Sequence, residues 1–170
     1  MTDPTDDPPG DLRFRRPTEA DHAVLVRQVD DWWGGRRLHD ILPRLWFQHF
    51  TRTSWVVEDG GGHLVGFLVG FISPDRPEEA YIHMVGTSPN HRKAGLGRAM
   101  YERFFADARA RGARRVSAIT WPGNRVSVGF HRAMGFEPAS GHGTQNLYGT
   151  PAYPDYDAEG GDRVVFSRGL

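Results

Sequence analysis

Residues 80–98, AYIHMVGTSPNHRKAGLGR, hold the groups in this chain that are best suited to chemistry. The apolar run 81–85 has strand character, Pro89 ends it, and Gly95 and Gly97 begin a long amphipathic segment. The first amides of a helix have no internal acceptor and lie at the positive end of its dipole. Glycines there let the backbone approach phosphate oxygens closely. The spacing therefore predicts a strand, a turn and a helix start that together bind a phosphate.

This glycine pattern differs from two well-known phosphate loops. A Walker A loop needs Gly-x-x-x-x-Gly-Lys-Ser/Thr, and a dinucleotide-binding loop needs three glycines after a strand with an acid about twenty residues later. Residues 92–97, RKAGLG, instead resemble the Arg/Gln-x-x-Gly-x-Gly/Ala signature of the GCN5-related N-acetyltransferases, and here too the signature follows a strand. Taken alone, the motif also fits a plain helix start with a solvated basic edge.

A second motif lies further along the chain. Residues 124–136, NRVSVGFHRAMGF, resemble that family's Asn-x-x-Ser/Ala-x-x-Phe-Tyr-x-x-x-Gly-Phe. Strand and helix patterns in a compatible order lie between and around the two motifs, so the resemblance covers most of the chain. It implies an α/β fold of the GNAT type, with a central mixed, mostly antiparallel sheet and helices on both faces.

The resemblance also implies a co-substrate, acetyl-CoA. The backbone of the central strand's end would bind its pantetheine arm, and the amides that follow would bind its pyrophosphate. Asn124 would reach the arm, although it also fits a plain helix cap. The residues implied in cofactor binding are Val85, Gly86, Thr87, Arg92, Lys93, Ala94, Gly95, Leu96, Gly97, Arg98, Asn124 and Phe130. No metal is implied.

A base is expected beside the thioester. The attack of an amine on a thioester passes through an oxyanion, which an amide of the central strand near Val85 is predicted to stabilise. Because an alkyl amine has a pKa of about 10.4, a base that works near neutrality helps. His83 is the candidate, since strand alternation puts its side chain on one face with Val85 and Thr87. Some members of the family use a histidine at this strand position. The alternative is a histidine that is structural or lines the acceptor pocket passively.

His131 stands where members of the family often have a tyrosine. The leaving thiolate gains from a proton donor because a thiol has a pKa of about 8.5. His131 is the candidate for this second catalytic role. The alternative is a helix residue that packs beside the cofactor.

Acids and aromatic residues in two loops predict an acceptor site for a cationic amine, through charge pairing and cation–π contact. The turn DDWWGGRR begins with two acids and two tryptophans, and residues 141–161 contain further tyrosines and aspartates. The predicted substrate-binding residues are Asp31, Trp33, Tyr148 and Tyr156, with Asp30, Trp32, Tyr153, Asp155 and Asp157 beside them. Taken singly, the tryptophans also fit a core role and the acids a solvated one. Residues 49–82 resemble the diaminobutyrate acetyltransferases, but the shared part is scaffold.

The composition bounds the function class. The 170 residues fit a single domain over 11–170 after a disordered leader at 1–10. Lysine and arginine together number 21, as do aspartate and glutamate, which argues against nucleic acid as a partner. A basic cluster in 91–115 suits a ligand with several phosphates or a solvated helix face. The chain has no cysteine and no apolar run of membrane-spanning length, so we expect a cytoplasmic protein without a membrane partner. A homodimer is compatible with the sequence.

The elements that must position these residues are read from periodicity and from turn residues. We expect strands at 12–16, 55–57, 63–72, 80–87, 115–120 and 163–168, and helices after Thr18, at 38–50, from Gly95 to Gly112 and at 124–134. The helix at 38–50 is expected to bury Ile41, Leu45 and Phe50. Residues 141–161 are expected to be an irregular loop.

These observations predict an N-acetyltransferase that uses acetyl-CoA and a primary amine, of a small molecule or less readily of a peptide or protein. Because the chain has no cysteine, direct attack is favoured over an acyl-enzyme. A non-catalytic acyl-CoA sensor on the same fold is the rival interpretation.

Overall fold

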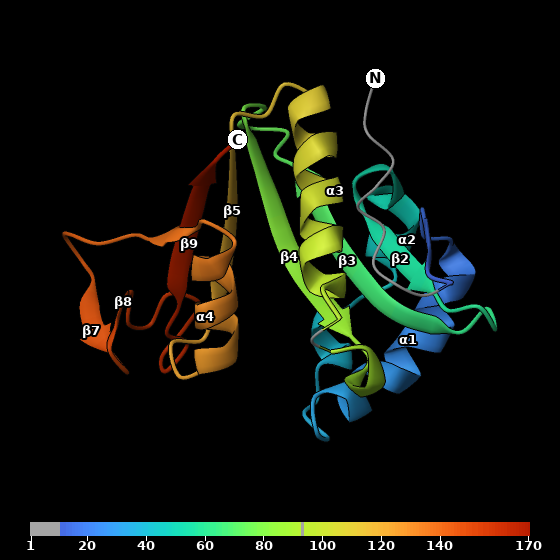
Figure 1. Cartoon of the computed structure of the whole chain (residues 1–170). Helices are drawn as coiled ribbons and strands as arrows, with labels where there is room; N and C mark the ends of the chain where they lie inside the picture. Colours follow the sequence, from blue (N-terminus) through green and yellow to red (C-terminus); the bar gives the residue numbers. More distant parts are fainter. Residues whose placement is uncertain (1–10, 93) are drawn as a thin grey trace.

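The computed structural model describes residues 11–92 and 94–170 (Figure 1). The predicted leader at 1–10 and the predicted cofactor residue Lys93 lie outside the described residues. The strands are β1 (Arg13–Arg15), β2 (Trp55–Glu58), β3 (Leu64–Ile72), β4 (Glu79–Thr87), β5 (Arg115–Thr120), β6 (Glu137–Pro138), β7 (Gln145–Leu147), β8 (Thr150–Ala152) and β9 (Val164–Gly169). The helices are α1 (Glu19–Trp32), α2 (Leu45–His49), α3 (Leu96–Ala110) and α4 (Arg125–Ala133), with short 3-10 turns η1 (His39–Ile41), η2 (Thr51–Thr53) and η3 (Pro89–His91).

Seven strands form one mixed sheet in the order β1-β2-β3-β4-β5-β9-β6, and β7 and β8 form a separate hairpin. Neighbours in the main sheet are antiparallel except β4 and β5, which are parallel. Helix α3 packs across β3 and β4 on one face of the sheet (Figure 1). The predicted fold class, a mostly antiparallel sheet with helices on both faces, is confirmed.

Each face of the sheet has its own apolar core. On one face, α3 buries Met100, Phe104 and Phe105 completely. On the other face, Leu25 and Val29 of α1 are buried together with Trp46 and Phe47 of α2. Strand β3 is buried along 64–70, between the two cores, which explains its nearly continuous apolar sequence.

Helix α1 begins as predicted. The carboxylate of Asp21 accepts a hydrogen bond from the backbone N–H of Thr18 over 2.6 Å, which satisfies an amide that has no partner in the helix. Its buried apolar residues, Leu25, Val29 and Trp32, recur at the spacing of one helix face. The end of α3 also agrees with the prediction, because Gly112 adopts a left-handed φ of 86° there.

The single helix predicted at 38–50 is wrong. The structure has η1 and then α2, separated at Pro43, and the Asp30 carboxylate accepts the backbone N–H groups of Leu38 and His39 over 2.8 and 2.9 Å. The break shifts the buried face by one residue, so Ile41 and Leu45 are 48% and 41% exposed. The core residues of this segment are Leu42, Trp46 and Phe47, with Phe50 partly buried against them.

The prediction of an irregular loop at 141–161 is also wrong in part, because β7 and β8 form a hairpin there. Its two turn residues, Tyr148 and Gly149, have φ values of 54° and 83°, the left-handed pair that a tight two-residue turn requires. Tyrosine is an uncommon residue at such a position, so the sequence carried little signal for the turn.

Candidate active site at the separation of two strands

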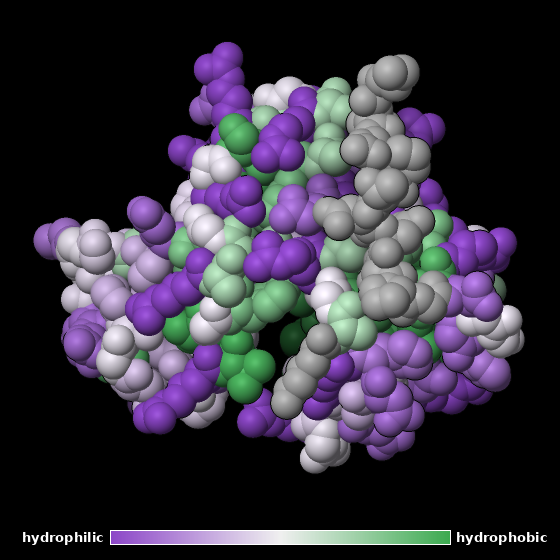
Figure 2. All heavy atoms as spheres, viewed as in Figure 1, coloured by the Kyte–Doolittle hydropathy of each residue, from purple (hydrophilic) through white to green (hydrophobic). Residues whose placement is uncertain are grey.

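The site lies where the sheet opens. β4 pairs with β5 only from Glu79 to Ile82, whereas on its other side it pairs with β3 as far as Thr87. Beyond Ile82, the backbone groups of β4 that face β5 therefore have no strand partner. The two strands diverge in Figure 1, and Figure 2 shows this face hollowed between the positions of α4 and the N-terminal end of α3. An extended ligand can therefore bind along the free edge of β4.

A β-bulge places His83 at the start of this free edge. On β3, the neighbours Gly70 and Val69 pair with Ile82 and Met84, so His83 is the extra residue. The bulge changes the alternation of β4. Ile82 and Val85 pack with the core beneath α3, whereas Met84 packs with the core beneath α1 and α2.

His83 lies on the α2 side of the sheet. Its ring stacks on Trp46 with centroids 4.5 Å apart, and its Nε2 donates to the carbonyl of Ile41 over 2.7 Å. The prediction that His83 and Val85 share one face is wrong, because the bulge interrupts the period of two. In the neutral ring, the Nε2–H bond to Ile41 leaves the lone pair on Nδ1. A base at this position would therefore act through Nδ1.

The turn after β4 leads into the N-terminus of α3. Gly95 has a φ of 78°, a left-handed value that favours glycine, and the first hydrogen bond of the helix runs from the N–H of Ala99 to its carbonyl. The amides of Leu96, Gly97 and Arg98 precede that bond and so have no acceptor within the helix. A Cβ on Gly97 would lie 3.4 Å from the ring of Phe130, which brings two of the predicted cofactor residues together.

Two further predicted cofactor residues serve the architecture of this turn. The guanidinium of Arg92 donates to the carbonyl of Trp32 at the end of α1, so its side chain ties the turn to that helix. Gly86 allows close packing, since a Cβ there would come within 2.5 Å of the Trp33 ring. Trp33 thus covers the end of β4 on the α1 side.

Asn124 and His131 occupy the two ends of α4. The side chain of Asn124 accepts the N–H of Ser127 over 3.2 Å, which is the helix-cap role considered from sequence. His131 is only 5% exposed, and its ring stacks on Phe166 with centroids 4.7 Å apart. Its Nδ1 donates to the Ser127 carbonyl over 2.8 Å, and its Nε2 accepts from the Tyr101 hydroxyl over 3.1 Å.

This environment keeps His131 neutral. Burial lowers the pKa of His131, and burial also raises the pKa of the Tyr101 hydroxyl. With one ring proton held by Ser127 and the other nitrogen acting as an acceptor, His131 has no proton aimed at a ligand. The geometry corresponds to the packing role considered from sequence, and it gives no support to proton donation by His131.

The predicted acceptor residues divide into two places. Tyr156 contacts Tyr153 in the loop after β8, with ring centroids 6.0 Å apart. Burial first, and then the charges of Tyr156 and Asp157, raise the pKa of Tyr81 on β4 to about 12. Tyr81 in turn contacts Phe71 on the α2 side of the sheet, with ring centroids 5.5 Å apart. Asp31 is exposed at the end of α1. We call the face of β4 that contacts the α1–α2 segment, through His83, Trp46 and Ile41, its acceptor side.

Tyr148 lies elsewhere. Its ring contacts Trp121 at 5.4 Å, and it lines a cavity of about 210 Å³ between α4 and the turn of the β7–β8 hairpin. Two other acids of these loops stabilise the backbone locally. Asp30 organises the start of η1, and Asp155 accepts the N–H of Gly160 over 2.6 Å.

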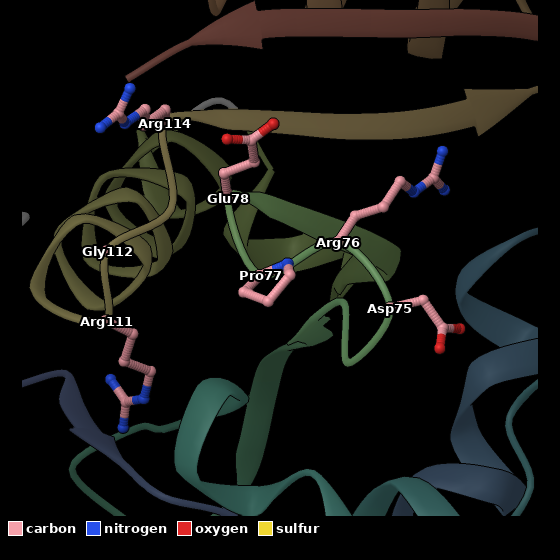
Figure 3. Close-up of a pocket in the computed structure, with 7 residues that line it drawn as sticks. All are labelled: Asp75, Arg76, Pro77, Glu78, Arg111, Gly112 and Arg114. Carbon is pink, nitrogen blue, oxygen red and sulfur yellow. The ribbon is translucent and has the colours of Figure 1, made fainter.

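A larger cavity of about 590 Å³ lies at the opposite end of β4 (Figure 3). Its acids and arginines come from the β3–β4 turn and the end of α3, and they point in different directions (Figure 3). Arg111 already donates to the carbonyls of Asp107 and Arg52 over 3.2 and 3.0 Å. The free edge of β4 lies at the other end of the strand, so this cavity is no part of the site. The lining residues are Asp75, Arg76, Pro77, Glu78, Arg111, Gly112 and Arg114.

Sequence reasoning missed four residues that shape the site: Ile41, Trp46, Tyr81 and Arg163. Ile41 acts through its carbonyl, which no side-chain pattern reveals. Trp46 was hidden by the wrong helix register. Tyr81 could have been found, since it lies two residues before His83 on the same strand. The sequence assigned Arg163 to the last strand, and only the structure shows that it forms an ion pair with Asp157 over 2.6 Å.

Within residues 11–92 and 94–170, no group of three or more histidines and acids is arranged to hold a metal ion. Over the same residues, no helix has the length and apolarity needed to cross a membrane.

Comparison with known proteins agrees with this geometry. Residues 22–136 match the acetyltransferase (GNAT) family. The L-2,4-diaminobutyric acid acetyltransferase of Streptomyces coelicolor is 30% identical over 147 residues, which cover 85% of this chain and 86% of that protein. The enzyme of the same name from Virgibacillus pantothenticus is 30% identical over 78% of this chain and 92% of its own length.

Solved structures show the same fold. Diaminobutyrate acetyltransferase EctA from Paenibacillus lautus, in complex with its substrate L-2,4-diaminobutyric acid and coenzyme A, has a TM-score of 0.68 at 21% identity, over 94% of this chain and 95% of that one. Ard1 from Thermoplasma volcanium has a TM-score of 0.74 at 18% identity, over 94% of this chain and 98% of that one.

Proposed function

The chain belongs to the GNAT family of acetyltransferases, and from that premise we propose that it transfers the acetyl group of acetyl-CoA to a primary amine of a small diamino acid such as L-2,4-diaminobutyrate. Two curated relatives that are 30% identical over most of their length carry the name of that activity. Their names support the choice of acceptor.

The observation that carries the proposal is the free edge of β4 beside the open start of α3. β4 loses its pairing with β5 after Ile82, and the amides of Leu96, Gly97 and Arg98 have no acceptor within their helix. Unpaired strand amides suit the amide groups of a pantetheine arm, and a helix start suits a pyrophosphate. The two sets are joined by one short turn, so a single extended molecule can bind both. The residues present therefore fit acetyl-CoA.

The proposed chemistry uses His83 at the bulge and the backbone amides at the end of β4. When bound, acetyl-CoA supplies the activated acetyl group. The backbone amides at the end of β4 are the donors available to an oxyanion that forms there. His83 holds a lone pair on Nδ1 while its Nε2 is fixed by the Ile41 carbonyl, so it can accept a proton from the attacking amine. Because the chain has no cysteine, the amine attacks the thioester directly.

The departure of the thiolate does not require His131. That residue donates to the Ser127 carbonyl and accepts from Tyr101 in the core. We propose that the thiolate leaves without a proton from this side chain.

One assay tests the proposal: release of CoA from acetyl-CoA, followed with L-2,4-diaminobutyrate, a panel of amino acids and simple diamines, and a peptide with a free N-terminus. We expect the fastest turnover with the diamino acid. Faster turnover of the peptide would instead indicate an enzyme that acts on proteins.

The rival function, an acyl-CoA sensor, is favoured by one observation: the helix position where the family often has a tyrosine is occupied by a buried histidine. The two functions differ in a simple readout. A sensor binds acetyl-CoA tightly and turns over no amine, whereas the enzyme turns over at least one.

A further inference from the structure

The loop between β8 and β9 is an ordered structure. Its ends are joined by a bridge between Tyr153 and Arg163, whose N–H groups donate to each other's carbonyls over 2.8 and 3.0 Å. Inside it, Asp162 accepts the N–H of Asp155 over 3.0 Å, and Asp155 accepts the N–H of Gly160. These bonds hold the loop without help from the side chain of Asp157.

Asp157 and Arg163 form an ion pair inside this loop. One oxygen of the Asp157 carboxylate lies 2.6 Å from Nη2 of Arg163, and the two side chains are 45% and 29% exposed. The other terminal nitrogen of the guanidinium, Nη1, donates to the Asp162 carbonyl over 2.8 Å, which fixes its orientation. A half-exposed ion pair adds little to stability. The loop therefore holds one anion and one cation side by side, both reachable from solvent.

This pair lies at the end of the sheet where β4 is free. Val164, the residue after Arg163, pairs with Thr120 at the end of β5, whereas β5 pairs with β4 only as far as Ala118. The charges of Asp157 and Arg163 both act on the hydroxyl of Tyr81. Tyr81 precedes His83 by two residues on β4, a distance of roughly 6–7 Å along a strand. In L-2,4-diaminobutyrate, four covalent bonds of about 1.5 Å each separate the distal nitrogen from the carboxylate carbon. An acceptor of that length is thus about as long as the distance between Tyr81 and His83 along β4.

We propose that Asp157 and Arg163 bind the acceptor's α-amino-acid group, Asp157 taking the α-ammonium and Arg163 the α-carboxylate, so that the distal amine reaches β4 beside His83. Each charge of the pair then exchanges its partner for an oppositely charged group of the ligand, so neither charge is left unpaired. A guanidinium matches a carboxylate with two parallel donors, which a simple amine without a carboxylate cannot use. The inference rests on the proposed function and assigns the residues that select its substrate.

The test compares Arg163→Gln and Asp157→Asn with the parent protein on three acceptors. These are L-2,4-diaminobutyrate, 1,3-diaminopropane, which lacks the carboxylate, and 4-aminobutyrate, which lacks the α-ammonium. For Arg163→Gln we expect a rise of about 10- to 100-fold in the KM for diaminobutyrate, the loss of a charged hydrogen-bond pair. Its kcat/KM for 1,3-diaminopropane and its KM for acetyl-CoA should stay within a few-fold of the parent values. Asp157→Asn should raise the KM for diaminobutyrate but leave the KM for 4-aminobutyrate unchanged.

Asp162→Asn is the matched control. Its side chain caps the backbone of the same loop without taking part in the ion pair, so its KM for diaminobutyrate should stay close to that of the parent protein. The inference is overturned if Arg163→Gln leaves that KM unchanged, if it weakens all acceptors and acetyl-CoA alike, or if Asp162→Asn has the same effect. Where the two shortened acceptors are too slow to measure, the KM for diaminobutyrate in the three variants decides. An absence of turnover by the parent protein on every amine contradicts the proposed function instead.

Discussion

Gly95→Ala separates the stability of α3 from its role in binding. Gly95 has a φ of 78° with nothing within 4 Å of an added Cβ, so the substitution adds backbone strain without a clash. Gly112, at the other end of the same helix, has a φ of 86° and is equally open. Gly112→Ala is therefore a control with the same chemistry, the same helix and the same kind of strain.

The two substitutions should cost similar stability. A left-handed conformation costs a residue with a Cβ about 1–2 kcal/mol. For a domain of this size, that lowers the melting temperature by about 2–8 °C. We expect both variants to unfold in this range below the parent protein, as measured by differential scanning calorimetry.

Their affinities for acetyl-CoA should differ. Relief of strain at Gly95 tilts the amides of the first turn, and the loss of one charged hydrogen bond, about 1.5–3 kcal/mol, weakens binding about 10- to 100-fold. At Gly112 the same relief occurs at the helix end furthest from the cofactor. Isothermal titration should therefore show a weaker Kd for Gly95→Ala and an unchanged Kd for Gly112→Ala. Equal Kd values for the two variants would refute the placement of the pyrophosphate.

Two further predictions concern the histidines. His83→Ala should lower kcat about 100-fold or more and leave the Kd of acetyl-CoA unchanged, since it removes the proposed base; an unchanged kcat on the best acceptor excludes that role. Because burial lowers the pKa of His131, the unfolded chain binds a proton there at higher pH than the folded one, so this contribution to stability is complete above about pH 6.5 and falls as the pH decreases. His131→Phe should remove that part of the pH dependence in denaturant titrations. His131→Phe should also lower the free energy of unfolding by about 1–3 kcal/mol at pH 7, because it leaves the Tyr101 hydroxyl unpaired. Adding Tyr101→Phe to His131→Phe should largely restore that stability. A parent protein whose stability does not change from pH 7 to pH 5 contradicts this account of His131.

Much of the fold could be predicted because its signals are local. The capping box at Thr18, the glycines that end helices and the apolar run of β3 each act within a few residues of chain. The turn at Gly95 could be predicted for the same reason.

The errors arose where a distant contact or a rare turn overrides the local pattern. Asp30 binds amides eight and nine residues later, which fixes η1 and breaks a helix that periodicity alone continues. The bulge at His83 depends on how β3 pairs with β4, so no period of two within β4 reveals it. Tyr148 and Tyr156 belong to one segment of sequence, yet Tyr148 contacts Trp121 at the hairpin turn whereas Tyr156 contacts Tyr153 in the following loop.

The most direct test of the central claim is hydrogen–deuterium exchange of the backbone amides with and without CoA. We predict that CoA slows exchange at residues 83–87 and 95–98, the free edge of β4 and the first turn of α3. Residues 75–78 and 111–114, which line the larger cavity at the other end of the sheet, should exchange at unchanged rates. Protection at that cavity, or no protection along β4 at saturating CoA, would contradict the account.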